Sequence, residues 1–270
     1  MPDHDPIDAT TPDELASSPL PADTVGLLEG LASTRAIRRY RDEPVPPAAL
    51  RAMLFAATRA PSGSNRQPFR FIVLTDGPKA RQAKELIATG ARKVWSGKRS
   101  NDGYDQGSGT VENSPKARMA ATMQRYTDEF ERVPVLVLPC LVRYRDPSPL
   151  EGASVYPACQ NLLLAARALG YGGVLTGFHA MVEAELRELL DVPEGVFMAA
   201  TITIGKPEGG HGPVRRRPLG ELVYGDGWGV VPDWAVDPAG TTHTQAGPPK
   251  GAQPLGTGSP DDAGTDSGNR

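Results

Sequence analysis

The sequence predicts a single α+β domain over residues 24–236, placed between two unstructured ends. Helical periodicities alternate with apolar runs of strand length along this stretch, which is the first observation behind the prediction. The second is the composition of the ends. Residues 1–23 carry six acidic side chains and no Lys or Arg, and residues 237–270 consist largely of Gly, Pro, Thr, Ser and Asp. We therefore expect an acidic disordered arm before the domain and a disordered tail after it.

The first half of the domain is predicted to pair a helix with a strand. The dipeptide Pro46-Pro47 is suited to start a helix, and apolar residues follow it at helical spacing until just before Pro61. A strand is expected over residues 69–75. A polar stretch, residues 96–114, is too rich in Gly, Asn, Asp and Ser for a core. It lies within an excursion, residues 91–131, that we expect to be mobile near the active site, although a solvated insertion is the simpler interpretation.

The second half alternates again between strands and helices. Residues 133–142 form a continuous apolar run that predicts a buried strand with Pro139 at its edge or end. The clearest helical period lies between Gly152 and Gly170, with Gly170 placed as its C-terminal cap. The remaining predicted elements are a helix over 116–130, a strand over 172–175, a helix over 182–190 and a strand over 197–204.

Charge and residue types exclude several classes of function. The chain has 29 basic and 32 acidic side chains, but residues 24–236 keep 27 and 22 of them, a mild surplus that suits small phosphorylated ligands better than nucleic acid. The start lacks a signal peptide and no apolar run is long enough to span a membrane, so a cytoplasmic protein is expected. Cys140 and Cys159 lie in apolar runs and are interpreted as buried thiols. The four histidines show no ligand spacing, so no metal site is predicted, and neither a Gly-x-Ser-x-Gly elbow nor a P-loop occurs.

A turn between the first helix and strand carries many short polar side chains. Prolines and a glycine set its backbone angles, and hydroxyl and amide groups could bond a polyhydroxylated or heterocyclic ligand, although a well-satisfied turn would look the same. The candidate ligand residues are Pro61, Ser62, Gly63, Ser64, Asn65 and Gln67.

Two arginine clusters flank this turn in the sequence. Arg35 and Arg38 are three apart and would share one side of a helical turn, a spacing that is also common for surface arginines. Near the end of the domain, Arg215 and Arg217 would project to one side of an extended segment, and the alternative is a solubilising basic run.

With these segments in this order, the chain resembles the nitroreductase family over roughly residues 24–234. The resemblance implies a three-layer fold with a central, mostly antiparallel sheet flanked by helices, and an intertwined homodimer. It implies FMN as cofactor, with the phosphate at Arg35, Ala36 and Arg38, where many family members have Ser in place of Ala36. Arg215 or Arg217, with Lys206 a weaker candidate, would complete the phosphate site. The turn residues listed above would line the flavin pocket, with Ser62 and Asn65 as the principal contacts.

The resemblance also implies where the hydride arrives. Thr176 and Gly177 follow a Gly-rich helix-to-strand turn that is not a dinucleotide-binding fingerprint, and their backbone would approach the flavin N5. A two-step exchange is implied, in which NAD(P)H, with NADPH weakly preferred, reduces FMN and then leaves so that a nitroaromatic, quinone or related acceptor can be reduced. Positioning of the reacting atoms would supply much of the rate enhancement, so no single residue is designated catalytic. The alternatives are a dehalogenating or flavin-fragmenting relative, a storage or sensor protein that binds FMN without turnover, and a structural dimer with an empty pocket.

Overall fold

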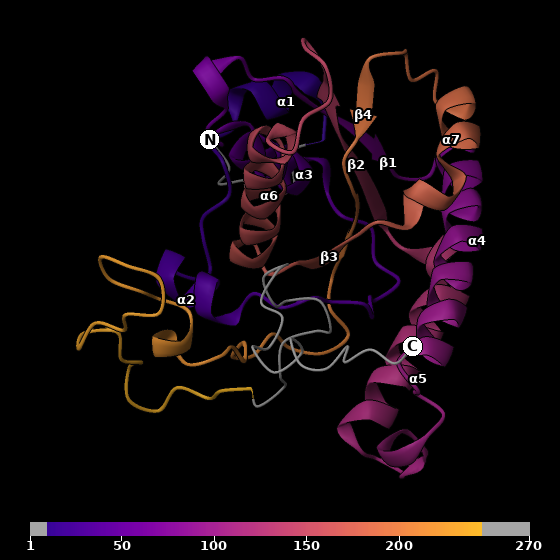
Figure 1. Ribbon diagram of the computed structural model, residues 1–270. Helices are drawn as coiled ribbons and strands as arrows, with labels where there is room; N and C mark the ends of the chain where they lie inside the picture. Colours follow the sequence, from indigo (N-terminus) through magenta and orange to yellow (C-terminus); the bar gives the residue numbers. More distant parts are fainter. Residues whose placement is uncertain (1–9, 245–270) are drawn as a thin grey trace, which may run out of the picture. The chain divides into compact units, whose positions relative to one another are not determined.

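The computed structural model describes residues 10–244, and within them the helices and strands alternate as expected (Figure 1). By their contacts the described residues fall into two units, one ending at Val214 and one beginning at Arg215. The longer helices are α1 (Pro12–Ser17), α2 (Leu27–Ser33), α3 (Pro47–Thr58), α4 (Pro78–Asn101), α5 (Pro115–Asp128), α6 (Tyr156–Ala168) and α7 (Glu183–Leu189). The strands are β1 (Phe69–Leu74), β2 (Val135–Val142), β3 (Gly172–Thr176), β4 (Val196–Met198) and β5 (Thr201–Gly205).

The strands of the described residues form one antiparallel sheet in the order β1-β2-β5-β3, with β4 paired to β2. Strand β2 is central, and its side chains alternate between two cores. Val135 and Val137 pack with α3 and α6, whereas Leu136 and Leu138 pack with α4 and α7. Figure 1 shows α3 and α6 on one side of the strands and α4 and α7 on the other. The sequence-based expectation of an α+β, three-layer fold is confirmed.

Pro139 lies inside β2, which continues on both sides of it, so the predicted location at an edge or end was wrong. On one side Pro139 pairs with Phe71 of β1, and on the other it falls between the residues that pair with β5 and those that pair with β4. Its carbonyl accepts from the N–H of Ala199 at 2.8 Å. Proline has no N–H to donate, and the missing donor would face the same gap between the two pairing regions. The same break divides the single strand expected over 197–204 into β4 and β5.

Helix α6 ends as its sequence predicts. Gly170 has φ of +76°, and the N–H of Tyr171 donates to the carbonyl of Ala166 at 2.8 Å, which closes the C-terminus. The small residues of α6 allow close approach of a second helix, and within this chain that helix is α3, to which the Asn161 amide donates at the Ala56 carbonyl. Both cysteines are buried, and burial raises the pKa of the Cys140 thiol to about 11 and that of Cys159 to about 12. They are thiols at neutral pH, as expected.

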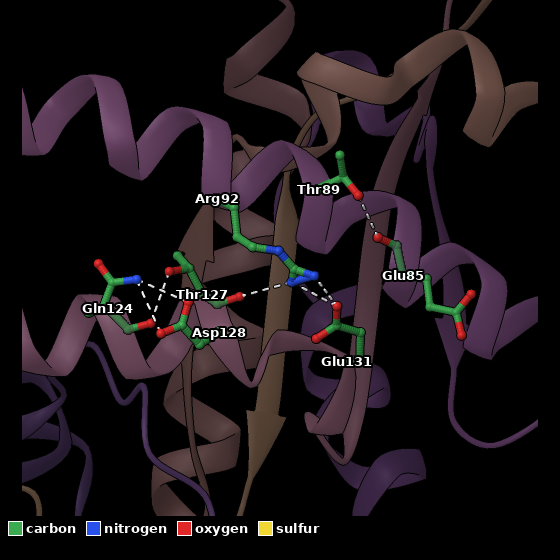
Figure 2. A network of polar contacts seen from close by, with 7 residues as sticks. All are labelled: Glu85, Thr89, Arg92, Gln124, Thr127, Asp128 and Glu131. Atoms are coloured by element: carbon green, nitrogen blue, oxygen red, sulfur yellow. Dashed lines mark hydrogen bonds and ion pairs between the residues drawn. The ribbon is translucent and has the colours of Figure 1, made fainter.

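The region expected as a mobile polar excursion contains a pair of packed helices. Helix α4 continues through Asn101, and α5 lies against it (Figure 1). Figure 2 shows Arg92 of α4 reaching the Thr127 carbonyl at 3.4 Å and the Glu131 carboxylate at 2.8 Å. Trp95 donates its indole N–H to Gln124 at 2.9 Å. Arg99 donates to the same Gln124 oxygen at 2.9 Å, so α5 also contacts the last turns of α4, and residues 96–101 are helical where a loop was predicted.

Part of the predicted acidic arm is also helical. Helix α1 begins with a capping box in which Thr11 and Glu14 exchange side-chain and backbone hydrogen bonds. Arg51 of α3 donates to the carbonyls of Leu15, Ser18 and Pro19. Residues 1–9 of the arm and 245–270 of the tail lie outside the described residues. None of the helices within residues 10–244 is long and apolar enough to cross a membrane.

Candidate functional site

The turn between α3 and β1 has an unusual backbone. Ser64, Asn65 and Gln67 all adopt positive φ, at 52°, 50° and 49°, a conformation that is uncommon outside glycine. Ser62 stabilises the turn by accepting from the N–H of Gln67 at 2.9 Å, and the Gln67 side chain donates to the Asn65 carboxamide oxygen at 3.2 Å. The hydroxyl of Ser64 and the amides of Asn65 and Gln67 belong to exposed residues. The turn therefore holds several polar groups at the surface in a fixed arrangement.

This turn lies at the N-terminal end of α6. The N–H of Gly63 donates to the Ser154 hydroxyl at 3.5 Å, just before that helix begins. Two residues further on, Tyr156 donates to the carbonyl of Ala199 at 3.3 Å, at the break between β4 and β5. Neither Ser154 nor Tyr156 was identified from the sequence, because only the fold brings residues so distant along the chain to the same end of a helix.

Arg35 and Arg38 do not lie on a helical turn, so that prediction was wrong. Helix α2 ends at Ser33, and the following segment, residues 34–40, is not helical. Its N–H at Ile37 donates to the Gly173 carbonyl at 3.0 Å, which places the segment beside the start of β3. The buried side chain of Ile37 fixes the segment to the core, while Arg35 is exposed and Arg38 half-buried on either side of it.

The arginine segment borders a recess of about 90 Å³ whose lining contains no carboxylate. Arginines and backbone groups of a Gly-rich loop surround it. The Nε of Arg38 is buried and has no hydrogen-bond partner among the described residues, which leaves an N–H donor for a ligand. The recess is suited to an anion. Its lining residues are Arg35, Ala36, Ile37, Arg38, Arg39, Thr122, Pro207, Gly209 and Gly210.

Thr176 and Gly177 lie at the end of β3, away from the strand start that contacts the arginine segment. Thr176 donates its hydroxyl to the Thr201 carbonyl at 3.3 Å. A Cβ added at Gly177 would meet nothing within 4 Å, so the space beside this residue is open. Gly173 and Thr176 are three residues apart on one strand, about 10 Å along it. A ligand of that length could contact both the recess and the end of β3.

The structure keeps the turn and the arginine segment apart within one chain. The turn contacts the N-terminal end of α6 through Ser154, whereas the residues just before the arginine segment contact its C-terminal end, where Arg167 donates to Ser33 at 3.2 Å. Helix α6 has 13 residues, which span about 20 Å. A single chain therefore does not bring Ser62 and Arg35 to one ligand phosphate.

Of the other predicted phosphate contacts, Lys206 belongs to the first unit. Its ammonium lies 5.2 Å from the centre of the Tyr171 ring. Arg215 and Arg217 belong to the second unit, in which Arg217 pairs with Glu221 at 3.2 Å. Their role toward a phosphate stays a prediction. No group of His, Cys, Asp and Glu within residues 10–244 could hold a metal ion.

Comparison with known proteins identifies the class of protein to which this chain belongs. The model of the nitroreductase family matches residues 31–206, and the chain belongs to that family. A protein of Archaeoglobus fulgidus, provisionally named an NADH dehydrogenase/NAD(P)H nitroreductase, is 28% identical over 183 residues, covering 67% of this chain and 85% of that protein. The 5,6-dimethylbenzimidazole synthase of Rhodospirillum rubrum is 26% identical over 180 residues, covering 66% of this chain and 80% of that enzyme.

Among solved structures, a provisionally named nitroreductase of Desulfovibrio desulfuricans in complex with FMN is similar to this chain. The TM-score is 0.55 at 29% sequence identity, and the match covers 76% of this chain and 99% of that one. The family resemblance of the sequence is thus confirmed, and so is the fold that it implied.

Proposed function

We propose that this chain is an FMN-dependent oxidoreductase that takes electrons from NAD(P)H and passes them to a small acceptor such as a quinone or a nitroaromatic compound. The observation that carries the proposal is the carboxylate-free recess beside Arg35 and Arg38 in a chain of the nitroreductase family. The relatives support it: the Archaeoglobus protein is named for NAD(P)H, and the Desulfovibrio structure contains FMN.

The residues present fit FMN. The phosphate carries close to two negative charges at neutral pH, which the guanidinium groups of Arg35 and Arg38 would neutralise. The unpartnered Nε of Arg38 would donate to the cofactor, and the open space beside Gly177 would admit the ring system to the end of β3. Bound FMN would supply the hydride-accepting and hydride-donating chemistry. The chain would bind and orient it and hold the second substrate against its exposed face.

The separation of the two segments supports a homodimer. Each site would take its phosphate-binding arginines from one chain and the turn carrying Ser62 and Asn65 from the other. In a two-fold dimer this arrangement occurs twice and leaves neither segment unused. The predicted homodimer is thus part of the proposed site, because one chain provides only half of the contacts.

The second unit fits a role across such a dimer. It exposes a run of large apolar side chains, of which Trp228 is 85% and Trp234 68% exposed. Surfaces this apolar are usually covered by a partner. We propose that residues 219–234 lie against the second chain.

The first experiment is the visible spectrum of the purified protein after FMN is added and excess is removed, followed by anaerobic addition of NADH or NADPH. The proposal requires retained flavin absorbance that either donor bleaches, and the mild basic surplus favours NADPH. Arg35→Ala should weaken FMN binding by roughly 1.5–3 kcal/mol, the usual contribution of a hydrogen bond to a charged group. Arg81→Ala, an exposed arginine outside the recess, is the matched control. Loss of FMN binding in both variants, or in neither, would contradict the phosphate assignment.

The similarity to 5,6-dimethylbenzimidazole synthase supports a flavin-fragmenting enzyme as the second candidate. The same experiment separates the two activities once air is readmitted. An acceptor reductase recovers its full flavin absorbance, whereas a fragmenting enzyme loses it permanently. Flavin that binds but is bleached by neither donor would instead indicate storage or sensing.

A further inference from the structure

His211 lies next to the arginine segment, in the Gly-rich loop that follows β5. Its Nε2 is 2.9 Å from the carbonyl oxygen of Tyr171. A Cβ added at Gly172 would lie 3.1 Å from that same Nε2 and 2.5 Å from a side-chain carbon of Ile37, so the ring fits against β3 beside the arginine segment because residue 172 is glycine. A Cβ at Gly212 would lie 3.8 Å from the Nη1 of Arg35. The residue that follows His211 therefore lies beside the Arg35 guanidinium, and the charge of Arg35 acts on the histidine.

Within residues 10–244, one ring nitrogen of His211 has no hydrogen-bond partner. Since Nε2 faces a carbonyl, it must carry the hydrogen and donate it, which leaves Nδ1 with a free lone pair in the neutral ring. Nδ1 is buried and has no hydrogen-bond partner among the described residues. Buried polar atoms are nearly always paired, so an orphaned one in the residue that follows Gly210, a lining residue of the recess, points to a ligand.

The charged groups around His211 are mainly cationic. Burial lowers its pKa first, the hydrogen bond to Tyr171 opposes this, and the charges of Arg167 and Arg35 lower it further. Lys206, in the same loop, lies over the Tyr171 ring.

The nearby carboxylates already have cationic partners. Glu29 lies 3.9 Å from Arg167, and Glu208 accepts two hydrogen bonds from Arg125. His211 is therefore neutral in the free protein. An anion bound at Arg35 would favour the protonated ring instead.

We propose that His211 is an additional phosphate-binding residue of the cofactor site, which takes up one proton from solvent on Nδ1 as FMN binds and donates it to a phosphate oxygen. This inference rests on the proposed function, because FMN supplies the phosphate. The bound phosphate would raise the pKa of His211, so binding would consume a proton over the pH range between its free and bound pKa values. FMN affinity would then fall as pH rises through that range.

The test is a set of FMN titrations, followed by flavin fluorescence, between about pH 6 and pH 8 for the wild-type protein and His211→Gln. Glutamine keeps a donor for the Tyr171 carbonyl but cannot take up the proton. Near pH 6 the variant should bind FMN about tenfold more weakly than the wild type, the effect of one hydrogen bond to a charged group, and the difference should shrink toward pH 8. The titration of the FMN phosphate itself affects both proteins equally, so it cancels in the ratio of the two FMN affinities.

Two controls make the result specific. Riboflavin lacks the phosphate, so its affinity should be the same in both proteins, and His243→Gln removes a histidine of the second unit and should behave as wild type. Calorimetry in two buffers of different ionisation enthalpy should show proton uptake by the wild type that His211→Gln lacks. An affinity ratio that does not change with pH, or an equal loss of riboflavin binding, would overturn the role of His211. Wild-type protein that binds neither flavin would overturn the proposed function itself.

Discussion

Arg125 and Glu208 form a two-point ion pair, with the guanidinium nitrogens 2.9 and 2.7 Å from the two carboxylate oxygens. Arg125 belongs to α5 and Glu208 to the loop after β5, the loop that contributes glycines to the recess beside Arg35. The next residue of α5, Tyr126, is buried and lies 2.8 Å from the Thr203 hydroxyl. The helical pair α4 and α5 is therefore tied directly to the candidate cofactor site.

Replacing Arg125 by Met should increase the local opening of α5 and have only a small effect on the free energy of unfolding. The pair is partly exposed to solvent, so the free energy of unfolding should fall by only about 1 kcal/mol or less. Amide hydrogen exchange within α5 should accelerate, because Tyr126 alone would then hold the helix against β5. Arg132→Met is the control, since its pair with Asp42, at 3.7 Å, is far more exposed. Exchange that accelerates equally in both variants would contradict this role of Arg125.

Lys84 is a buried cation whose ammonium has a structural role. Its Nζ donates to the carbonyls of Thr75 at 2.7 Å, Val133 at 2.8 Å and Pro134 at 3.3 Å, and so joins α4 to the start of the central strand. Lys84→Met would leave these carbonyls without their donor. Urea denaturation should show a loss of about 2–3 kcal/mol, against less than about 0.5 kcal/mol for the exposed Lys79→Met. Similar losses for the two variants would show that the three bonds contribute little.

His179 should make the fold sensitive to acid. Burial lowers its pKa, and both ring nitrogens are engaged: Nε2 with the Met198 carbonyl at 3.0 Å and Nδ1 with the Thr201 hydroxyl at 3.1 Å. The unfolded chain binds a proton at this residue near pH 6.5 and the folded chain only at lower pH, so stability falls as pH drops below about 6.5. Between pH 7.5 and pH 5.5, roughly one unit either side of that value, the urea midpoint should fall less in His179→Gln than in wild type. Equal falls would assign the acid sensitivity to other groups.

Two glycines of α4 provide a matched test of packing. A Cβ at Gly90 would lie 2.7 Å from the carbonyl oxygen of Phe178, whereas one at Gly97 would meet nothing within 4 Å. Gly90→Ala should therefore cost about 1–3 kcal/mol through overpacking. Gly97→Ala should stabilise the protein by up to about 1 kcal/mol, the helix propensity difference. Thermal or urea unfolding of both variants measures this, and stabilisation in both would show that the two segments separate easily.

Local patterns were sufficient to predict most of the fold. Pro47 at the start of α3 and Gly170 after α6 are positions where backbone chemistry alone sets a boundary. Errors arose where tertiary pairing decides the outcome. Pro139 is accommodated inside the sheet because β2 changes partner there, and residues 96–101 are helical because α5 packs beside them.

The geometry around the candidate site residues could not be predicted from their spacing. The spacing of Arg35 and Arg38 suggested a helix, yet the segment is not helical and is joined to β3 by the hydrogen bond from Ile37 to Gly173. His211 was dismissed because no ligand spacing surrounds it. Its Nδ1, which has no partner among the described residues, and the closeness of Gly212 to Arg35 indicate a role, and both depend on contacts between distant segments.

We propose that each FMN is bound by the arginine segment of one chain and the turn of another, and mixing two variants tests this sharing. Arg35→Ala and Asn65→Ala proteins should each bind FMN poorly. In a mixed dimer the intact arginine of one chain would meet the intact turn of the other, so subunit exchange at equal concentration should restore about a quarter of the wild-type sites. Restored FMN binding on mixing is the predicted result. If the mixture binds no more FMN than the separate variants, although exchange has occurred, the site is not shared between chains and the account is wrong.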